Sequence, residues 1–275
     1  MFTLNCNGRL LVAERPLVMG IINLTPDSFY EDSRAGGVDA VLRHTEQMLK
    51  EGADIIDIGA QSTRPGSAML TADEELSRIA AVIDVVTDKF PEAHFSVDTF
   101  YARVAEVCVS AGASMVNDIS GGQIDPELIS TVAKLRVPYV CMHIRGTPQN
   151  MTQFANYTDV TREVLDYFIQ KIRICREAGI KDIILDPGFG FSKTSEHNFE
   201  LLKNLGALKI PGLPLLAGLS RKSTIYKTLG ITAADALNGT TTLNTVALLN
   251  GADILRVHDV REAVECVKLI GHLRR

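Results

Sequence analysis

The sequence predicts an α/β fold, a single (β/α)₈ (TIM) barrel with a short N-terminal β-hairpin. Short apolar runs alternate with longer amphipathic segments from Leu17 onward, which is the pattern of parallel strands joined by helices. This unit occurs eight times with no linker-like stretch, so residues 1–275 are interpreted as one domain. Glycine stands where a helix should end at four helix-to-strand junctions, at Gly52, Gly112, Gly179 and Gly251. Their recurrence indicates similar corners in one repeating architecture.

The elements can be assigned in order along the chain. Asn7-Gly8 is a strong two-residue turn signal, and it predicts a hairpin within residues 1–14. Strands are expected at Leu17–Asn23, Asp54–Gly59, His94–Asp98, Ser114–Asp118, Pro138–His143, Asp182–Asp186, Leu213–Gly218 and Asp253–Val257. Helices are expected at 37–51, 72–89, 100–111, 125–135, 157–178, 195–208, 232–250 and 259–272. The alternative is an open doubly wound sheet, but no strand here leads into the GxGxxG motif common in that fold.

Composition excludes several classes of protein. The 275 residues carry a formal net charge of −5 and are 46% hydrophobic, which supports one large core and excludes a disordered chain. A mildly acidic chain lacks the dense basic surface of a nucleic-acid binder. The sequence shows neither an apolar run of membrane-spanning length nor a signal-peptide pattern, and its five cysteines have no paired spacing. We therefore expect a cytoplasmic protein that acts on small molecules, with no nucleic-acid or membrane partner.

Polar residues recur at the predicted C-terminal ends of the strands, where barrels of this kind build their active sites. These residues include Asn23, Asp57, Asp98, Asn117, Asp118, His143, Asp186, Lys222, Arg256 and His258. For Asp118 or Asp259 alone, capping of the following helix is an equally good explanation. That explanation fails for the whole set, because Asp57, Asp98 and Asp186 fall inside or at the end of apolar runs. Buried there, each carboxylate needs a hydrogen-bond donor from the protein or from a ligand.

The stretch Asp186-Pro-Gly-Phe-Gly-Phe191 is the most unusual of these strand ends. An apolar run stops on a carboxylate, and proline and two glycines then turn the chain sharply. Phe189 and Phe191 lie in this turn, which predicts the floor of a pocket. His143, at the end of the preceding strand, is interpreted as a hydrogen-bonded core residue rather than a ligand contact.

The strand-end residues divide into two chemical groups. Asp98, Asn117 and Asp186 provide carboxylates and an amide, which suit the amino and ring N–H edge of a flat heterocycle. Met142 is placed to contact such a ring. Donors and cations suited to phosphate oxygens are Thr63, Arg64, Lys222, Arg256 and His258. Asn23 is an oxygen ligand that, with a substrate diphosphate, could hold Mg²⁺. The residues together suggest a heterocycle that carries a diphosphate.

Eight sequence blocks, in order and spanning nearly the whole chain, resemble the dihydropteroate synthase family. They are Met19-Gly-Ile-Ile-Asn-Leu-Thr-Pro-Asp-Ser-Phe29, Asp57-Ile-Gly-Ala-Gln-Ser-Thr-Arg-Pro-Gly66, Ser96-Val-Asp-Thr99, Val116-Asn-Asp-Ile119, Leu185-Asp-Pro-Gly-Phe-Gly-Phe191, Glu196-His-Asn198, Ser220-Arg-Lys-Ser223 and Arg256-Val-His-Asp-Val260. The resemblance implies a transferase of folate synthesis that condenses 6-hydroxymethyl-7,8-dihydropterin diphosphate with 4-aminobenzoate. It also implies a (β/α)₈ fold, Mg²⁺ and a homodimer.

The resemblance further implies a role for each matching residue. The pterin would be held by Asp98, Asn117, Met142, Asp186 and Lys222, of which Asp98, Asp186 and Lys222 are the expected catalytic residues. The diphosphate would contact Thr63, Arg64, Arg256 and His258, and the metal would contact Asn23. The aminobenzoate site would include Thr63, Pro65, Phe191 and Ser220. We expect an SN1-like substitution without a strong general base, because an arylamine is already neutral at pH 7.

Two departures from the family pattern stand near these residues. The segment Tyr30–Gly37 differs from the usual short continuation, and we expect it to form a mobile loop that closes over the substrates. Gln61 replaces a common glutamate, which removes one negative charge. Two other functions remain open: a pterin-binding methyltransferase domain and a non-catalytic sensing barrel. The first would not need the cationic residues after the last two strands, and the second would lose Lys222, Asn23 or Asp98, all of which are present.

Overall fold

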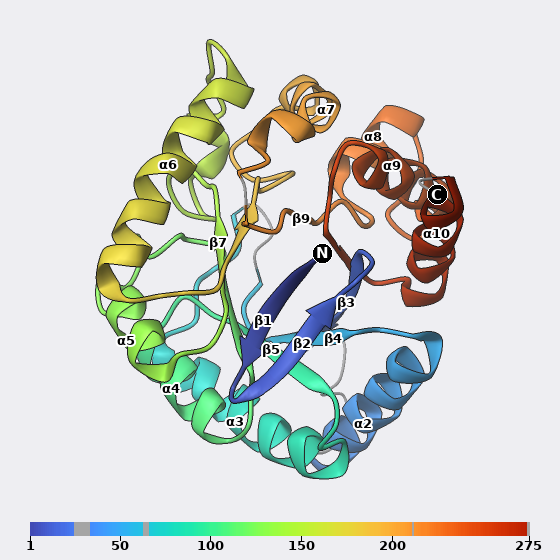
Figure 1. The fold of residues 1–275 in the computed structure, drawn as a ribbon. Helices are drawn as coiled ribbons and strands as arrows, with labels where there is room; N and C mark the ends of the chain where they lie inside the picture. Colours follow the sequence, from blue (N-terminus) through green and yellow to red (C-terminus); the bar gives the residue numbers. More distant parts are fainter. Residues whose placement is uncertain (25–33, 63–65, 211, 274–275) are drawn as a thin grey trace.

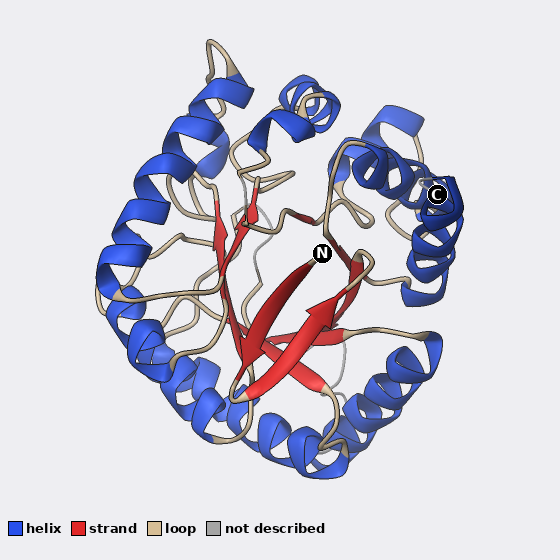
Figure 2. Ribbon diagram, in the orientation of Figure 1, coloured by secondary structure: helices blue, strands red, loops and turns tan. Residues whose placement is uncertain are grey.

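The computed structural model describes residues 1–24, 34–62, 66–210 and 212–273, with the backbone alone for 34–36. Its barrel strands are β3 (Leu17–Asn23), β4 (Ile55–Gly59), β5 (His94–Asp98), β6 (Met115–Asp118), β7 (Tyr139–Met142), β8 (Ile183–Asp186), β9 (Leu216–Ala217) and β10 (Ile254–Val257). All eight are parallel, in the order β8-β7-β6-β5-β4-β3-β10-β9. A bridge between Leu185 and Leu215 joins the two ends of this sheet. The closed sheet, with helices around its outside (Figures 1 and 2), confirms the predicted barrel.

The helices of the described residues are α2 (Arg34–Glu51), α3 (Ala72–Lys89), α4 (Ala102–Ser110), α5 (Leu128–Leu135), α6 (Val160–Ala178), α7 (Ser195–Lys203), α8 (Ser223–Leu229), α9 (Leu237–Leu249) and α10 (Val260–Leu273), with short 3₁₀ turns η1 (Met151–Phe154) and η2 (Leu205–Leu208). The predicted corner glycines are confirmed. Gly52, Gly112, Gly179 and Gly251 all have φ between 99° and 109°, a left-handed conformation that only glycine adopts without strain. None of these helices is both long and apolar enough to cross a membrane.

Three boundary predictions differ most from the structure. The expected strand Leu213–Gly218 shrinks to the two residues of β9, because Pro214 has no N–H to donate to a neighbouring strand. The expected helix 195–208 changes to the 3₁₀ turn η2 after Lys203. The expected helix 232–250 begins only at Leu237, and α8 precedes it. Seven residues are too few for α8 to show a periodic apolar pattern in the sequence.

The N-terminal hairpin is confirmed and closes one end of the barrel. Strands β1 (Phe2–Cys6) and β2 (Arg9–Ala13) are antiparallel, and Asn7 and Gly8 have φ of 52° and 83°, as a tight two-residue turn requires. Figure 1 shows the hairpin lying across the barrel. An apolar cluster packs under it: Leu4, Cys6, Ala13, Leu17, Met19, Ile55, Met115, Val140, Ile184, Leu216 and Ile254. Among the described residues, this cluster seals the barrel interior at the N-terminal ends of the strands, so a polar site is expected at the opposite mouth.

Candidate active site

Strand register brings the predicted polar residues together at the C-terminal mouth of the barrel. Asp98 is paired with Asn117 between β5 and β6, and Met142 is paired with Asp186 between β7 and β8. Gly59 of β4, paired with Asp98, leaves space for that carboxylate, because a Cβ at Gly59 would lie 2.9 Å from the Asp98 Cβ. Each of these residues is the last or second-last of its strand, so all of them lie at the same end of the parallel sheet.

Arg256 of β10 is the centre of a buried ionic network. Its Nε donates to Asp57 Oδ2 at 2.6 Å, and its Nη2 donates to Asp98 Oδ2 at 2.6 Å. Asn117 Nδ2 donates to the same Asp57 oxygen at 2.9 Å. Asp57 itself is fully buried, and its hydrogen bonds fix the orientations of Arg256 and Asn117. The sequence indicates that a buried Asp57 needs a donor, but it does not identify these partners.

Burial shifts the pKa values of the mouth carboxylates toward neutrality. It raises the pKa of Asp98 to about 7; the Arg256 guanidinium opposes this shift, whereas the charge of Asp57 adds to it. Burial also raises the pKa of Asp186, against the attraction of Lys222 and the hydrogen bond from the Gly188 N–H. Both groups therefore titrate closer to pH 7 than ordinary aspartates, as functional groups in buried sites often do.

The turn after β8 brings Asp186, Phe191 and Lys222 together. The Gly188 N–H donates to Asp186 Oδ1 at 2.8 Å and holds the carboxylate at the strand end. Lys222, the residue before α8, donates from Nζ to the Phe189 carbonyl at 2.5 Å and lies 4.8 Å from the centre of the Phe191 ring. Burial lowers the pKa of Lys222 to about 8, and Asp186 opposes the shift. The ammonium is thus held beside both a carboxylate and an aromatic ring.

The two phenylalanines of this turn have different surroundings. Phe189 is buried in the large core between strands and helices. Phe191 instead joins a small apolar cluster at the mouth, with Phe100, Ile119, Met142, Ile144 and Met151. This cluster provides a flat apolar wall next to the polar edge formed by Asp98, Asn117 and Asp186. The predicted pocket floor therefore involves Phe191 and Met142, and not Phe189.

Ser220 and His258 form a pair after β9 and β10. Ser220 Oγ lies 3.0 Å from His258 Nδ1 and accepts the His258 backbone N–H at 3.2 Å. Partial desolvation and the nearby Arg256 charge lower the pKa of His258, so its ring is neutral at pH 7. In that state it can donate one hydrogen bond to an anion but adds no charge.

Arg221 is a structural residue of the mouth, and its role was not predicted from the sequence. Its Nε and Nη2 donate to both carboxylate oxygens of Asp259, at 2.9 and 2.8 Å. It has a φ of 53°, an uncommon conformation for a residue other than glycine. This pair ties the turn that carries Ser220 and Lys222 to the start of α10. Asp259 therefore serves the fold through this ion pair.

Asp118 is also structural. It accepts hydrogen bonds from the Ser120 and Gly122 N–H groups at 2.7 and 2.6 Å, and from the Tyr139 hydroxyl at 2.6 Å. These contacts tie its side chain to the loop after β6 and turn it away from the barrel interior. Of the two polar residues that end β6, only Asn117 belongs to the mouth.

The loops after β3 and β4 lie partly outside the described residues. Thr63, Arg64 and Pro65 are not described, and neither is the segment 25–33, so their predicted roles are not tested. The prediction of a loop over Tyr30–Gly37 is wrong at its C-terminal end, because α2 begins at Arg34. The base of the second loop is described. Gln61 donates to Glu75 at 2.7 Å and to the Leu70 carbonyl at 3.1 Å, and it accepts the Leu70 N–H at 3.0 Å. The Gln61 amide therefore joins the two ends of this loop by hydrogen bonds.

Asn23 offers a limited but suitable contact for a divalent cation. It ends β3 and is half-buried next to Gly59. Within the described ranges, no three His, Cys, Asp or Glu side chains lie close enough together to hold a metal ion. Mg²⁺ commonly keeps several waters and takes few protein oxygens when substrate phosphates complete its coordination. A single amide oxygen therefore fits an ion that is shared with a diphosphate.

A closed (β/α)₈ barrel with carboxylates, an amide, cations and an apolar wall at its C-terminal mouth defines a small-molecule enzyme site. A family model described as pterin binding enzyme matches residues 19–258. The chain belongs to this family of pterin-binding enzymes, and the predicted family resemblance is confirmed.

Its relatives include dihydropteroate synthases of several bacteria. The chain is 39% identical to that of Escherichia coli K12 over 96% of this chain and 93% of the relative, and 41% identical to that of Synechocystis over 95% and 91%. Two solved structures of the Xanthomonas albilineans dihydropteroate synthase are also similar. The structure with 4-aminobenzoic acid has a TM-score of 0.92 at 38% identity, and the structure with 7,8-dihydropteroate has a TM-score of 0.88 at 36% identity. Each alignment covers 99% of this chain and 98% of the other.

Proposed function

We propose that this protein catalyses the dihydropteroate synthase reaction. It condenses 6-hydroxymethyl-7,8-dihydropterin diphosphate with 4-aminobenzoate and releases 7,8-dihydropteroate and diphosphate. The observation that carries the proposal is the convergence of Asp98, Asn117, Asp186 and Lys222 at one barrel mouth. The chain belongs to a family in which a solved relative binds 4-aminobenzoic acid and 7,8-dihydropteroate in this fold.

The pterin occupies the polar edge of the mouth in this proposal. Asp98 and Asp186 accept hydrogen bonds from its amino and ring N–H groups, and Asn117 completes the edge. Lys222 donates to a ring acceptor from its position beside Phe191. Met142 packs against the flat face of the ring, since it lies in the apolar cluster of the mouth.

The diphosphate lies on the cationic part of the mouth, next to the pterin edge. We assign it to Thr63, Arg64, Arg256 and His258, of which Arg256 and His258 are described. Arg256 keeps N–H groups beyond the two that bind Asp57 and Asp98, and its side chain is 18% exposed. Asn23 would hold Mg²⁺ together with the diphosphate, and the ion would neutralise charge on the leaving group.

The reaction proceeds as an SN1-like substitution. The bond between the pterin methylene and the diphosphate oxygen breaks, and its electron pair leaves with diphosphate. Asp98 and Asp186 stabilise the positive charge that spreads over the pterin. The lone pair of the aminobenzoate nitrogen then forms the new C–N bond, and its proton passes to solvent. We place the aminobenzoate against Phe191, with Ser220 and the loop residues Thr63 and Pro65 around it.

Mixing purified protein with Mg²⁺ and the two substrates tests the proposal directly. The expected products are dihydropteroate and diphosphate in equal amounts. Absence of product while the pterin diphosphate still binds would instead support a non-catalytic sensing barrel. An Asp186→Asn variant tests the electrostatic step. It should slow pterin–diphosphate bond breaking in a single-turnover assay without aminobenzoate, and an unchanged rate would refute the role of this carboxylate.

Two further proposals concern the assembly and location of the protein. Exposed apolar side chains occur on the face made by the neighbouring helices α7, α8 and α9, at Phe199, Leu229 and Leu249, and at Ile231 after the end of α8. We assign this face to a homodimer interface, because a second copy of the chain would bury these groups. Light scattering should show a dimer, and a Leu249→Glu variant should dissociate it.

All five cysteines are free thiols, which supports a reducing cytoplasmic location.

A further inference from the structure

Lys193 lies next to the turn after β8, yet it has no role in the mechanism above. Its Nζ is within hydrogen-bond distance of three acceptors: His143 Nδ1 at 2.9 Å, the Gly188 carbonyl at 3.1 Å and the Phe191 carbonyl at 3.1 Å. These contacts account for the donors of a lysine ammonium group. Lys193 therefore links both ends of the turn to the end of β7.

The turn that Lys193 holds is also closely packed against the backbone of His143. A Cβ at Gly188 would lie 2.1 Å from the His143 carbonyl oxygen, and Gly188 has a φ of 69°. The Phe191 N–H donates to the Gly188 carbonyl at 3.1 Å, the same oxygen that accepts from Lys193. The Gly188 N–H in turn orients Asp186 Oδ1. A single residue of the turn thus connects Lys193 to the carboxylate of the pterin edge.

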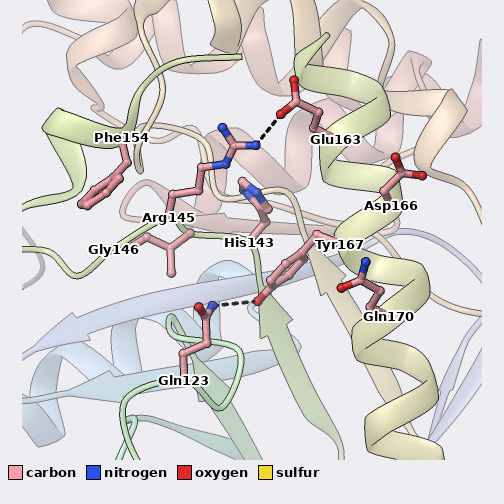
Figure 3. A pocket seen from close by; sticks show the side chains of 10 residues that line it. Gln123, His143, Arg145, Gly146, Phe154, Glu163, Asp166, Tyr167 and Gln170 are labelled. Carbon is pink, nitrogen blue, oxygen red and sulfur yellow. Dashed lines mark hydrogen bonds and ion pairs between the residues drawn. The ribbon is translucent and has the colours of Figure 1, made fainter. Parts of the chain in front are cut away.

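His143, directly after β7, gives Lys193 a fixed partner. The ring of His143 packs edge-on against Tyr167, with centroids 4.8 Å apart. Tyr167 in turn donates from its hydroxyl to the Met142 carbonyl at 2.9 Å. His143 and Tyr167 also line a cavity of about 450 Å³ between α6 and the loop after β7, together with Arg145 (Figure 3). The histidine is therefore anchored independently of the turn that Lys193 holds.

The charges around this pair favour a neutral histidine. Burial is the largest cause that lowers the pKa of His143, and Lys193 and Arg145 lower it further. Burial also lowers the pKa of Lys193, whereas Asp186 opposes that shift. With His143 neutral, its Nδ1 accepts the hydrogen bond and the proton lies on Nε2. A lysine placed here binds three fixed acceptors, whereas an apolar side chain would leave them without this donor.

We propose that Lys193 is a positioning residue for the condensation, because it holds the turn that orients the Asp186 carboxylate and the Phe191 ring. The inference rests on the synthase activity proposed above. Lys193 does not touch the reacting atoms in this role. It fixes the two groups that face the pterin and the aminobenzoate, and displacement of such groups by about 1 Å can cost about 100-fold in rate.

A Lys193→Met variant tests the proposal, with Lys171→Met as the matched control. Lys171 also donates to a loop carbonyl, that of Gly121 at 2.6 Å, but that loop follows β6. Lys193→Met should raise the KM for the pterin diphosphate and lower kcat, with kcat/KM reduced about 100-fold. Lys171→Met should leave both constants near their wild-type values. Urea unfolding of both variants separates a loss of positioning from a loss of stability.

Substitution of the partner provides a second test if Lys193→Met does not fold. Asn in a His143→Asn variant offers an amide oxygen near the position of Nδ1, whereas Leu in His143→Leu offers no acceptor. His143→Asn should keep most activity, and His143→Leu should match the defect of Lys193→Met. Wild-type kinetics in Lys193→Met, or equal defects in His143→Asn and His143→Leu, would refute the inference. A wild-type protein that forms no dihydropteroate would instead refute the proposed function.

Discussion

Replacement of Asp57 by asparagine tests the ionic network of the mouth most directly. Asp57 is fully buried, and its Oδ2 accepts both Arg256 Nε at 2.6 Å and Asn117 Nδ2 at 2.9 Å. Asparagine has nearly the same shape and can present an oxygen at the same place. The change therefore removes one negative charge and preserves the packing.

Two effects of the Asp57→Asn change can be given a size and a sign. A buried hydrogen bond to a charged group contributes about 1.5–3 kcal/mol and a neutral one about 0.5–1.5 kcal/mol, so we expect a loss of about 1–2 kcal/mol of stability. The charge of Asp57 also helps to raise the pKa of Asp98 to about 7. Without that charge, the pKa of Asp98 should fall, and Asp98 should stay ionised at lower pH.

Urea unfolding and a pH profile measure these effects. The variant should unfold at a lower urea concentration with an unchanged m-value, since its packing is preserved. In the wild-type protein, protonation of Asp98 should raise the KM for the pterin diphosphate as pH falls below about 7. In Asp57→Asn this acid limb should move to lower pH. An acid limb that stays in place or moves upward would refute the argument that Asp57 shifts Asp98.

Three further predictions concern other parts of the mouth. Gly59→Ala should raise the KM for the pterin diphosphate in steady-state assays, because its Cβ would lie 2.9 Å from the Asp98 Cβ and displace that carboxylate; an unchanged KM would contradict this. Lys222 should lose its charge as pH rises above about 8, so kcat/KM should fall there, and the fall should be absent in Lys222→Met. Gln61→Glu would face Glu75, whose pKa burial already raises. The urea midpoint of the Gln61→Glu variant should drop relative to that of the wild type as pH rises from 5 to 8. The buried carboxyl groups of the native state keep protons that the unfolded state has already lost, so stability falls as these groups ionise.

The sequence was sufficient to predict the barrel and the location of its site. The strands of a barrel are short apolar runs, and β3 and β5 have the predicted bounds. The Asn7-Gly8 turn and the corner glycines are local signals, since each depends on the conformation of one or two residues. Placement of Asp98, Asn117 and Asp186 at one mouth followed from their positions at strand ends, because parallel strands share a direction.

Contacts between distant parts of the chain were not predictable. Arg256 was assigned to the diphosphate, but its two carboxylate partners lie 158 and 199 residues away in the sequence. The periodicity of apolar residues along the sequence does not indicate which side chains contact each other across a closed barrel. The same limit applies to Lys193 and His143, which are 50 residues apart. The sequence indicates that His143 is a hydrogen-bonded core residue, but it does not identify Lys193 as the partner.

The sequence by itself determined which polar residues stand at the strand ends of this barrel, and the tertiary structure decided which of them face the mouth and what each does there. Strand ends follow from local periodicity and turn residues, which are properties of neighbouring positions. The division between Asp57, which orients Arg256, and Asp98, which also faces the mouth, depends on how strands β4, β5 and β10 are staggered when the sheet closes. Closure sets distances between residues that have no relation along the chain, and these distances determine charge, orientation and pKa.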